Sequence, residues 1–135
     1  EITTRLVGSE MCIRDRDVKE NINEKLDILG FLVIKYDKNT RISKQTLEYF
    51  NHAYPGKIFQ TKIRRNVKFD ETPLRHKSIF EHSIDANGAE DYISLAEEIT
   101  GETRPEDWKE KILSAWLGEH PDDESVIEQL NNLKK

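Results

Sequence analysis

Four basic residues in the middle of the chain are the side chains best suited to binding an anion. They are Lys62, Arg64, Arg65 and Lys68. On one exposed surface they can hold nucleic-acid phosphates without reading base sequence, with an affinity that falls steeply as salt rises. No aromatic platform is interleaved with them, so stacking on single-stranded bases is not predicted. The sequence leaves a second interpretation equally open, in which these cations pair with acids such as Glu71 or the acidic C-terminal segment.

The sequence contains no phosphate-binding loop. Such loops use glycines so that backbone amides can approach phosphates, and a lysine to meet their charge. None of the six glycines lies in G-x-x-x-x-G-K-[ST] or in a lysine-doubled variant of it. The apolar run Ile28 to Asp37 superficially resembles a strand that ends in a magnesium-binding aspartate, but a core strand followed by a turn is favoured. The scattered histidines and the single cysteine predict neither a metal site nor a nucleophile.

Length and charge limit the possible classes of protein. At 135 residues the chain is expected to be one domain. The net charge is −5, but the segment Lys57–Lys77 is basic and the segment from Asp85 onward is acidic. That asymmetry indicates an anion-facing surface on one segment only. No apolar run approaches the roughly 20 residues that span a bilayer, and the lone Cys12 implies no oxidising compartment. We therefore expect a cytoplasmic protein.

The first sixteen residues are interpreted as a non-native leader. The chain starts with Glu1 rather than Met, and Leu6–Arg16 resembles a peptide translated from sequencing-adapter DNA. Such segments are set aside before the fold is considered. We expect that the natural N-terminal portion is missing from this sequence; a natural leader is the alternative.

The segment that follows predicts an α/β fold with two parallel strands. Ile28–Tyr36 is a continuous apolar run and fits a strand buried on both faces. A helix should begin near Ile42 and end near Pro55-Gly56, and Lys57–Ile63 should form a second strand. A strand–helix–strand order implies a right-handed crossover and parallel pairing. A two-stranded sheet is small, so we expect marginal stability or self-association.

The second half of the chain predicts helices. Asn66–Thr72 can form a short helix stopped by Pro73, followed by a loop through Asp85. Asn87 can cap the next helix, which Gly101 should end.

Two further helices are predicted after Gly101. Thr103 and Glu106 have capping-box spacing, and Asp122–Glu124 suits the first turn of a last helix. The apolar stripe of the penultimate helix should dock against the body of the chain or on the last helix. A membrane-surface helix would need a strongly basic polar face, whereas this one alternates Lys109, Glu110 and Lys111 and precedes an acidic turn. This stripe comprises Trp108, Ile112, Leu113, Trp116 and Leu117.

Two motifs resemble one known family. They are IRRNVKFDETP, at Ile63–Pro73, and NGAEDYISLAEEI, which starts at Asn87. In this order they resemble the C-terminal third of ParA/Soj-type partition ATPases of the MinD/ParA P-loop superfamily, over about Val18 to Thr100. The resemblance implies the C-terminal portion of a P-loop NTPase-like three-layer fold, with two parallel strands and surrounding helices, over residues 17–101. Residues 102–135 would be a helical C-terminal extension.

The family resemblance implies a function for the intact parent protein. Such proteins bind ATP and Mg²⁺ between two subunits of a homodimer, coat double-stranded DNA non-specifically and respond to a ParB-like stimulatory protein. They segregate plasmids or chromosomes and are cytoplasmic and nucleoid-associated, with no membrane partner. The present chain lacks Walker A and Walker B motifs, so we expect no cofactor bound by it alone and no activity.

The resemblance also assigns residues. The adenine side would be formed by Ile34, Lys35, Ile63, Arg64, Arg65 and Asn66. The DNA-binding surface would include Lys38, Arg41, Lys62 and Lys68, with Lys38 or Arg41 replacing an arginine that is Asn39 here. Arg64 stands where the family has proline, which alters the expected base pocket. Two alternatives remain: a non-catalytic DNA- or protein-binding adaptor, and a MinD-like membrane-surface ATPase.

Overall fold

The computed structural model describes residues 17–135, which belong to two compact units. The first ends at Gly30, and its described part contains a short helical segment over residues 17–21. The second covers Phe31–Lys135 and contains all the strands and helices considered below. The proposed non-native leader lies outside the described residues.

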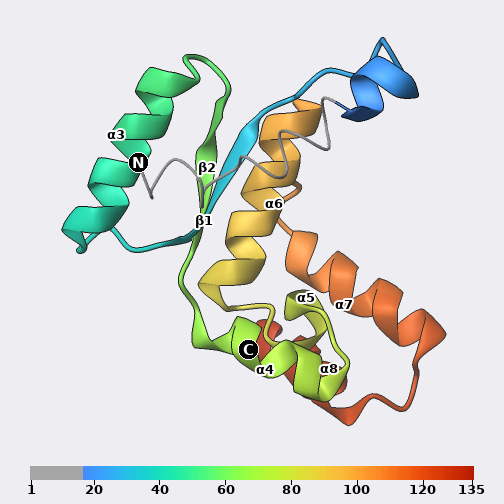
Figure 1. Cartoon of the computed structure of the whole chain (residues 1–135). Helices are drawn as coiled ribbons and strands as arrows, with labels where there is room; N and C mark the ends of the chain where they lie inside the picture. The colour runs from blue at the N-terminus through green and yellow to red at the C-terminus, as the bar shows by residue number, and fades with distance from the viewer. Residues whose placement is uncertain (1–16) are drawn as a thin grey trace. The chain divides into compact units, whose positions relative to one another are not determined.

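A pair of parallel strands joined by a helix confirms the predicted α/β class. Strand β1 (Phe31–Tyr36) pairs with β2 (Ile58–Arg64), and helix α3 (Arg41–Ala53) connects them (Figure 1). Tyr36 lies opposite Arg64 in the register, so the carboxyl ends of the two strands are level. Residues that follow the two strands are thereby brought to the same end of the sheet.

Strand β1 differs from its prediction in both length and burial. It begins at Phe31, three residues later than expected, and Ile34 is 60% exposed. The prediction of burial on both faces is therefore wrong. Only β2 pairs with β1 in the described chain, and the ring of Tyr54, after α3, packs on Phe31 at 4.6 Å rather than on Ile34. Lys35 has φ +53°, a left-handed conformation that bends the end of the strand.

Helix α4 (Val67–Arg75) begins as predicted but continues past its proline. Asn66 caps it, its side-chain oxygen accepting the Lys68 N–H at 2.9 Å. Pro73 lies inside the helix, so the predicted stop is wrong. A proline removes the N–H that would bond the carbonyl four residues earlier. The Thr72 hydroxyl donates to that carbonyl, Phe69 O, at 2.9 Å and so offsets the loss.

The predicted loop through Asp85 contains a short helix, α5 (Ile79–His82). Ser78 and Glu81 form a reciprocal capping box at its start. The Ser-x-x-Glu spacing is visible in the sequence and is the signal that the prediction missed. Ile79 is buried, which fixes this turn against the rest of the unit.

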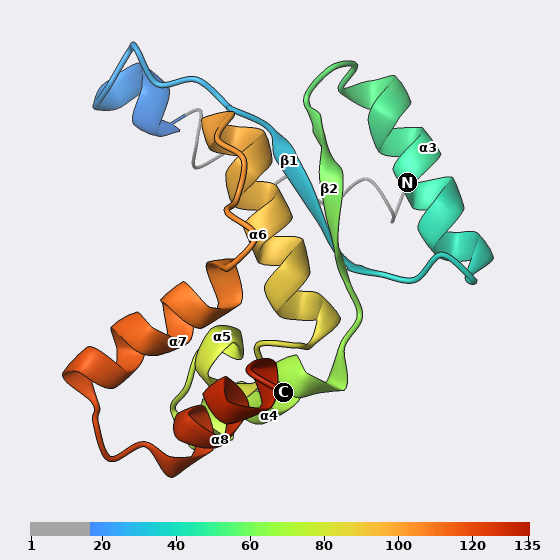
Figure 2. The same ribbon diagram turned by 180° about the vertical axis from the view of Figure 1, so that it is seen from behind.

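Helix α6 (Asn87–Thr100) lies on the opposite side of the strand pair from α3, as both views show (Figures 1 and 2). Its predicted cap is wrong: Ala86 is the N-cap residue and Asn87 is already helical. The Asn87 carbonyl instead accepts a bond from the Arg64 guanidinium at 3.4 Å. The predicted end is confirmed, because Gly101 has φ +74° and closes the helix.

Helix α7 (Trp108–Glu119) does not use the predicted capping box. Asp107 is its N-cap residue, without a side-chain hydrogen bond, so the Thr103–Glu106 box is wrong. Pro105 disfavours helical geometry at the residue before it. That residue, Arg104, is held in contact with α6, since its N–H donates to Glu97 at 2.7 Å.

The core of the second half is shared by two helices and the turn that follows α5. Ile84 after α5, Leu113 of α7 and Val126 of α8 (Glu124–Leu133) are 0–1% exposed and touch one another. The predicted docking of the α7 stripe on the last helix is confirmed. Residues packed around this centre are Phe80, Trp108, Ile112, Trp116, Leu117, Leu130 and Leu133.

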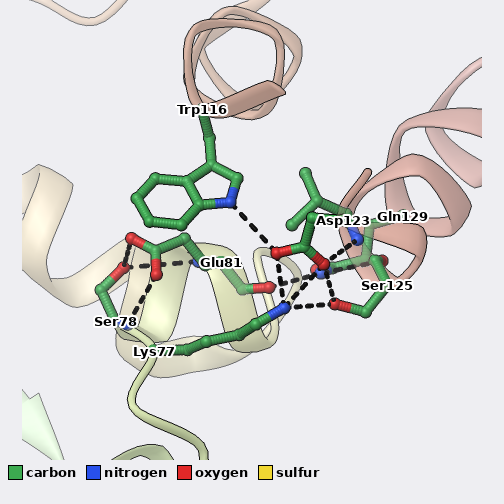
Figure 3. A network of polar contacts seen from close by, with 8 residues as sticks. Lys77, Ser78, Glu81, Trp116, Asp123, Ser125 and Gln129 are labelled. Carbon is green, nitrogen blue, oxygen red and sulfur yellow. Dashed lines mark hydrogen bonds and ion pairs between the residues drawn. The ribbon is translucent and has the colours of Figure 1, made fainter. Parts of the chain in front are cut away.

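A polar network fastens α8 to the segment that leads into α5 (Figure 3). The Lys77 ammonium donates to both oxygens of Asp123, at 2.7 and 2.6 Å, and to the Ser125 hydroxyl at 2.7 Å. Asp123 also accepts the Trp116 indole N–H at 3.1 Å. The hydrogen bond from Lys77 is the main reason that the pKa of Asp123 lies well below its usual range.

Removing the Asp123 charge should make the chain less stable and less acid-sensitive. The depressed pKa contributes stability above the usual aspartate pKa of about 3.9, and that stability disappears as pH falls below it. Asp123→Asn should cost about 1–2 kcal/mol at pH 7. Thermal unfolding followed from pH 7 to pH 2 should show a smaller acid-induced loss in the variant than in the wild type. Parallel curves would contradict this role for Asp123.

Candidate functional site

The two segments expected beside a nucleotide base lie together at the carboxyl end of the sheet. The Arg65 N–H donates to the Tyr36 carbonyl at 3.1 Å, so the chain after β2 runs next to the end of β1. Ile34 and Lys35 thus lie on one strand and the Ile63–Asn66 segment at the end of its neighbour. The fold brings together residues that lie some thirty positions apart in the sequence.

Within this group the side chains have different environments. Ile63 is 4% exposed and belongs to the core, so only its backbone is available to a ligand. Asn66 uses its side-chain oxygen to cap α4. Ile34 is exposed, and Arg65 is exposed and makes no side-chain hydrogen bond or ion pair with another described residue. An apolar side chain, a guanidinium and backbone groups are therefore available at this edge.

Arg64, which replaces the family's proline, is committed to an ion pair. Its Nη2 donates to Asp91 Oδ1 at 2.6 Å, and its Nε contacts both Asp91 oxygens at 2.9 and 3.1 Å. The Arg64 backbone N–H also donates to Asp91, at 2.8 Å. Asp91 is 7% exposed, and its hydrogen bond raises the pKa of the Arg64 guanidinium. The contact is a bidentate clamp that ties the end of β2 to α6.

A second carboxylate of α6 supports the same strand. Glu98 accepts the backbone N–H groups of Gln60 and Thr61 at 2.6 and 2.8 Å. Burial opposes ionisation of Glu98, but these hydrogen bonds prevail and lower its pKa. Asp91 and Glu98 were not singled out by the sequence, because a carboxylate seven residues from another on a helix is an ordinary pattern. Both satisfy backbone groups that a strand edge would otherwise expose.

The four cations expected to contact DNA fall into two pairs. The side chains of Lys38 and Arg41 are exposed, and neither makes a hydrogen bond or ion pair with another residue of the described chain. Lys62 is turned onto its own strand, where its ammonium donates to Gln60 O at 2.8 Å. Lys68 donates to Glu71 at 3.0 Å. The alternative in which Lys62, Arg64, Arg65 and Lys68 pair with acids thus describes Arg64 and Lys68, but not Lys62 or Arg65 among the described residues.

Further free cations lie next to Lys38 and Arg41. Lys35 precedes the turn and Lys44 follows one helical turn after Arg41, and both side chains are exposed. Lys38 lies in the turn before α3, and Arg41 and Lys44 are one turn apart at the start of the helix. The sequence prediction did not include Lys44, although its spacing from Arg41 was a usable signal.

The described residues contain no candidate cluster for a metal ion. No cluster of three or more histidine, cysteine, aspartate or glutamate side chains is placed to hold a metal among residues 17–135. The glycines of α6 and α7 sit inside helices, and Gly56 and Gly101 lie in left-handed turns.

The comparisons with known proteins agree with the two motifs. Over 83 residues the chain is 36% identical to the chromosome-partitioning ATPase Soj of Thermus thermophilus, covering 62% of this chain and 33% of that protein. It is 33% identical over 84 residues to the sporulation initiation inhibitor protein Soj of Bacillus subtilis, with the same shares. The chromosome partitioning protein ParA of Myxococcus xanthus is 26% identical over 95 residues, or 70% of this chain and 34% of that protein.

The resemblance to ParA/Soj-type partition ATPases is confirmed. The chain spans about a third of the length of these ParA/Soj-type relatives. No family model matches it. No helix in the described part of the chain has the length and apolarity needed to cross a membrane.

Proposed function

We propose that this chain is part of a ParA/Soj-type partition ATPase, to which it contributes the adenine-side edge and a non-specific DNA-binding surface. The observation that carries the proposal is the juxtaposition of Tyr36 and Arg65 at the end of the sheet, with unpaired cations directly after β1. The intact parent would be a homodimer that uses ATP and Mg²⁺, binds double-stranded DNA and meets a ParB-like partner. It would act at the nucleoid in plasmid or chromosome segregation.

The residues of this chain have limited roles in nucleotide chemistry. ATP supplies the transferable phosphoryl group in such proteins, and its phosphates are held by residues that this sequence does not contain. Backbone groups of Lys35 and of the segment after β2, with the amide of Asn66, would border the base. The Arg64–Asp91 clamp would keep that segment in place against α6. Residues 17–101 would form this ATPase portion, and residues 102–135 a helical extension of it.

The DNA-binding proposal is tested by reversing the two unpaired cations. The double variant Lys38→Glu/Arg41→Glu should weaken binding to a mixed-sequence DNA duplex by on the order of tenfold or more at low salt, because two phosphate contacts become repulsive. The plot of log affinity against log salt should become shallower by about 1.8, at about 0.9 per lost contact. Fluorescence anisotropy across a salt series measures both quantities.

The matched control reverses two cations at the opposite end of the chain. Lys134→Glu/Lys135→Glu changes the net charge equally but alters the end of α8. This control should keep most of the affinity and the wild-type salt slope. Equal losses in both double variants would mean that net charge alone governs binding. No salt-sensitive binding by the wild type would overturn the DNA-binding function.

The intact gene distinguishes the ATPase from a non-catalytic adaptor. Reads that extend upstream of residue 17 should reveal an in-frame, lysine-rich phosphate loop if the parent is an ATPase. An unrelated fold in that position would favour a DNA- or protein-binding adaptor. A MinD-like membrane-surface role predicts that the chain floats with liposomes, which the docked α7 stripe does not favour.

A further inference from the structure

One oxygen of Glu71 is contacted by two basic side chains. Glu71 Oε2 accepts the Lys68 ammonium at 3.0 Å and lies 2.7 Å from Nε2 of His82. These contacts, the one from His82 above all, lower the pKa of Glu71 and keep it ionised. Glu71 is thus charged at neutral pH and can act as a counter-ion of Lys68.

Glu71 is held in this position from the side of α5. The His82 side chain is 11% exposed, so it is fixed by packing, whereas the Lys68 side chain is 48% exposed. The neighbouring α5 backbone is fixed in turn by Gln129 of α8, whose amide donates to Glu81 O and accepts Ile84 N–H, both at 2.8 Å. Glu71 is therefore anchored by the largely buried His82, while Lys68 is the more exposed partner of the pair.

We propose that Glu71 is a built-in competitor that occupies Lys68 until nucleic-acid phosphate displaces it. This inference rests on the DNA-binding function proposed above. It explains how Lys68 can form an ion pair with Glu71 in the free protein and still bind DNA phosphate. An exposed ion pair is weak, since solvent screens it. Phosphates of a duplex can therefore outcompete Glu71, and the pair lowers the affinity without abolishing it.

Removing the Glu71 charge should tighten DNA binding through Lys68. Glu71→Gln should bind a mixed-sequence duplex about two- to fivefold more tightly at low salt, which matches the strength of an exposed pair. Its salt slope should steepen by up to about 0.9, because Glu71 still holds Lys68 in a part of the wild-type complexes, whereas Lys68 is free to contact phosphate in every complex of the variant. The measurement uses the full chain and the same anisotropy salt series.

Two matched variants separate a specific effect from a change in net charge. Asp70→Asn removes one exposed negative charge from the adjacent position of α4 and should leave the salt slope unchanged. In the Lys68→Ala background, Glu71→Gln should no longer steepen the slope. Unchanged far-UV circular dichroism and melting temperature establish that each variant is folded.

The outcomes separate this inference from the proposed function. The competition is supported if Glu71→Gln tightens DNA binding more than Asp70→Asn does, and only when Lys68 is present. The competition is overturned if Glu71→Gln leaves the affinity of the wild type unchanged, or if it tightens binding equally in the Lys68→Ala background. In both cases the DNA-binding function stands. Absence of binding by the wild type and every variant overturns the function itself.

Discussion

Gly88→Ala is expected to destabilise the chain by about 1–3 kcal/mol, the usual cost of overpacking a filled site. A β-carbon at Gly88 would lie 2.5 Å from two ring carbons of Phe69. The ring cannot easily retreat, because it also packs edge-on against Tyr92 with centroids 5.7 Å apart. In an open helix the same change would stabilise by roughly 0.5–1 kcal/mol. The sign of the result therefore reports whether α4 and α6 approach each other this closely.

Two controls make this prediction sharp. Gly118→Ala places a β-carbon in open space on α7 and should raise the unfolding midpoint. Phe69→Leu lacks the ring atoms that the new carbon meets, so Gly88→Ala should cost much less in that background. Chemical denaturation of the wild type, Gly88→Ala, Phe69→Leu and the double variant gives the coupling free energy between positions 69 and 88. Additive effects would contradict the close approach.

The second large effect concerns the core shared by the C-terminal helices. Leu113→Ala should cost about 2–5 kcal/mol, because a fully buried leucine leaves a cavity when truncated. Ile127→Ala, on the partly exposed side of α8, should cost far less. Guanidinium unfolding of both variants measures the difference.

The same experiment tests whether residues 102–135 unfold with the rest of the second unit. Both tryptophans lie on α7, so their fluorescence reports the C-terminal helices, whereas far-UV circular dichroism reports all the helices. Because Ile84 completes the core of Leu113 and Val126, we expect the two transitions to coincide. A separate early fluorescence transition would mean that the extension melts independently.

The motifs of the sequence acquire physical explanations in the fold. Gly88 and Ala89 of the second motif are small because α6 starts against α4; Ala89 is 0% exposed. Asp91 of the same motif holds Arg64 from the first motif. Residues of the two motifs therefore touch in the fold, which their spacing along the chain does not reveal.

The sequence alone was sufficient for features that depend on local chemistry. The apolar runs, the turn at Gly56 and the stop at Gly101 indicated the strand–helix–strand order and the end of α6. It failed where local signals compete with distant partners. The predicted Thr103–Glu106 capping box does not form, because Arg104 is bonded to Glu97 of α6 instead. The predicted end of α4 at Pro73 is wrong, because the Thr72 hydroxyl bonds the carbonyl that the proline leaves without its usual partner.

Only the tertiary structure decided which cations are available to a ligand. Lys38, Arg41, Lys62 and Lys68 have equal standing in the sequence, since each is a charged residue in a polar segment. The fold places the anchored Glu71 beside Lys68 and leaves Lys38 and Arg41 facing solvent. The Lys68–Glu71 pair lies within α4 and follows from its i,i+3 spacing. The contact that anchors Glu71 comes from His82 of α5, and it forms only after α4 and α5 have packed together.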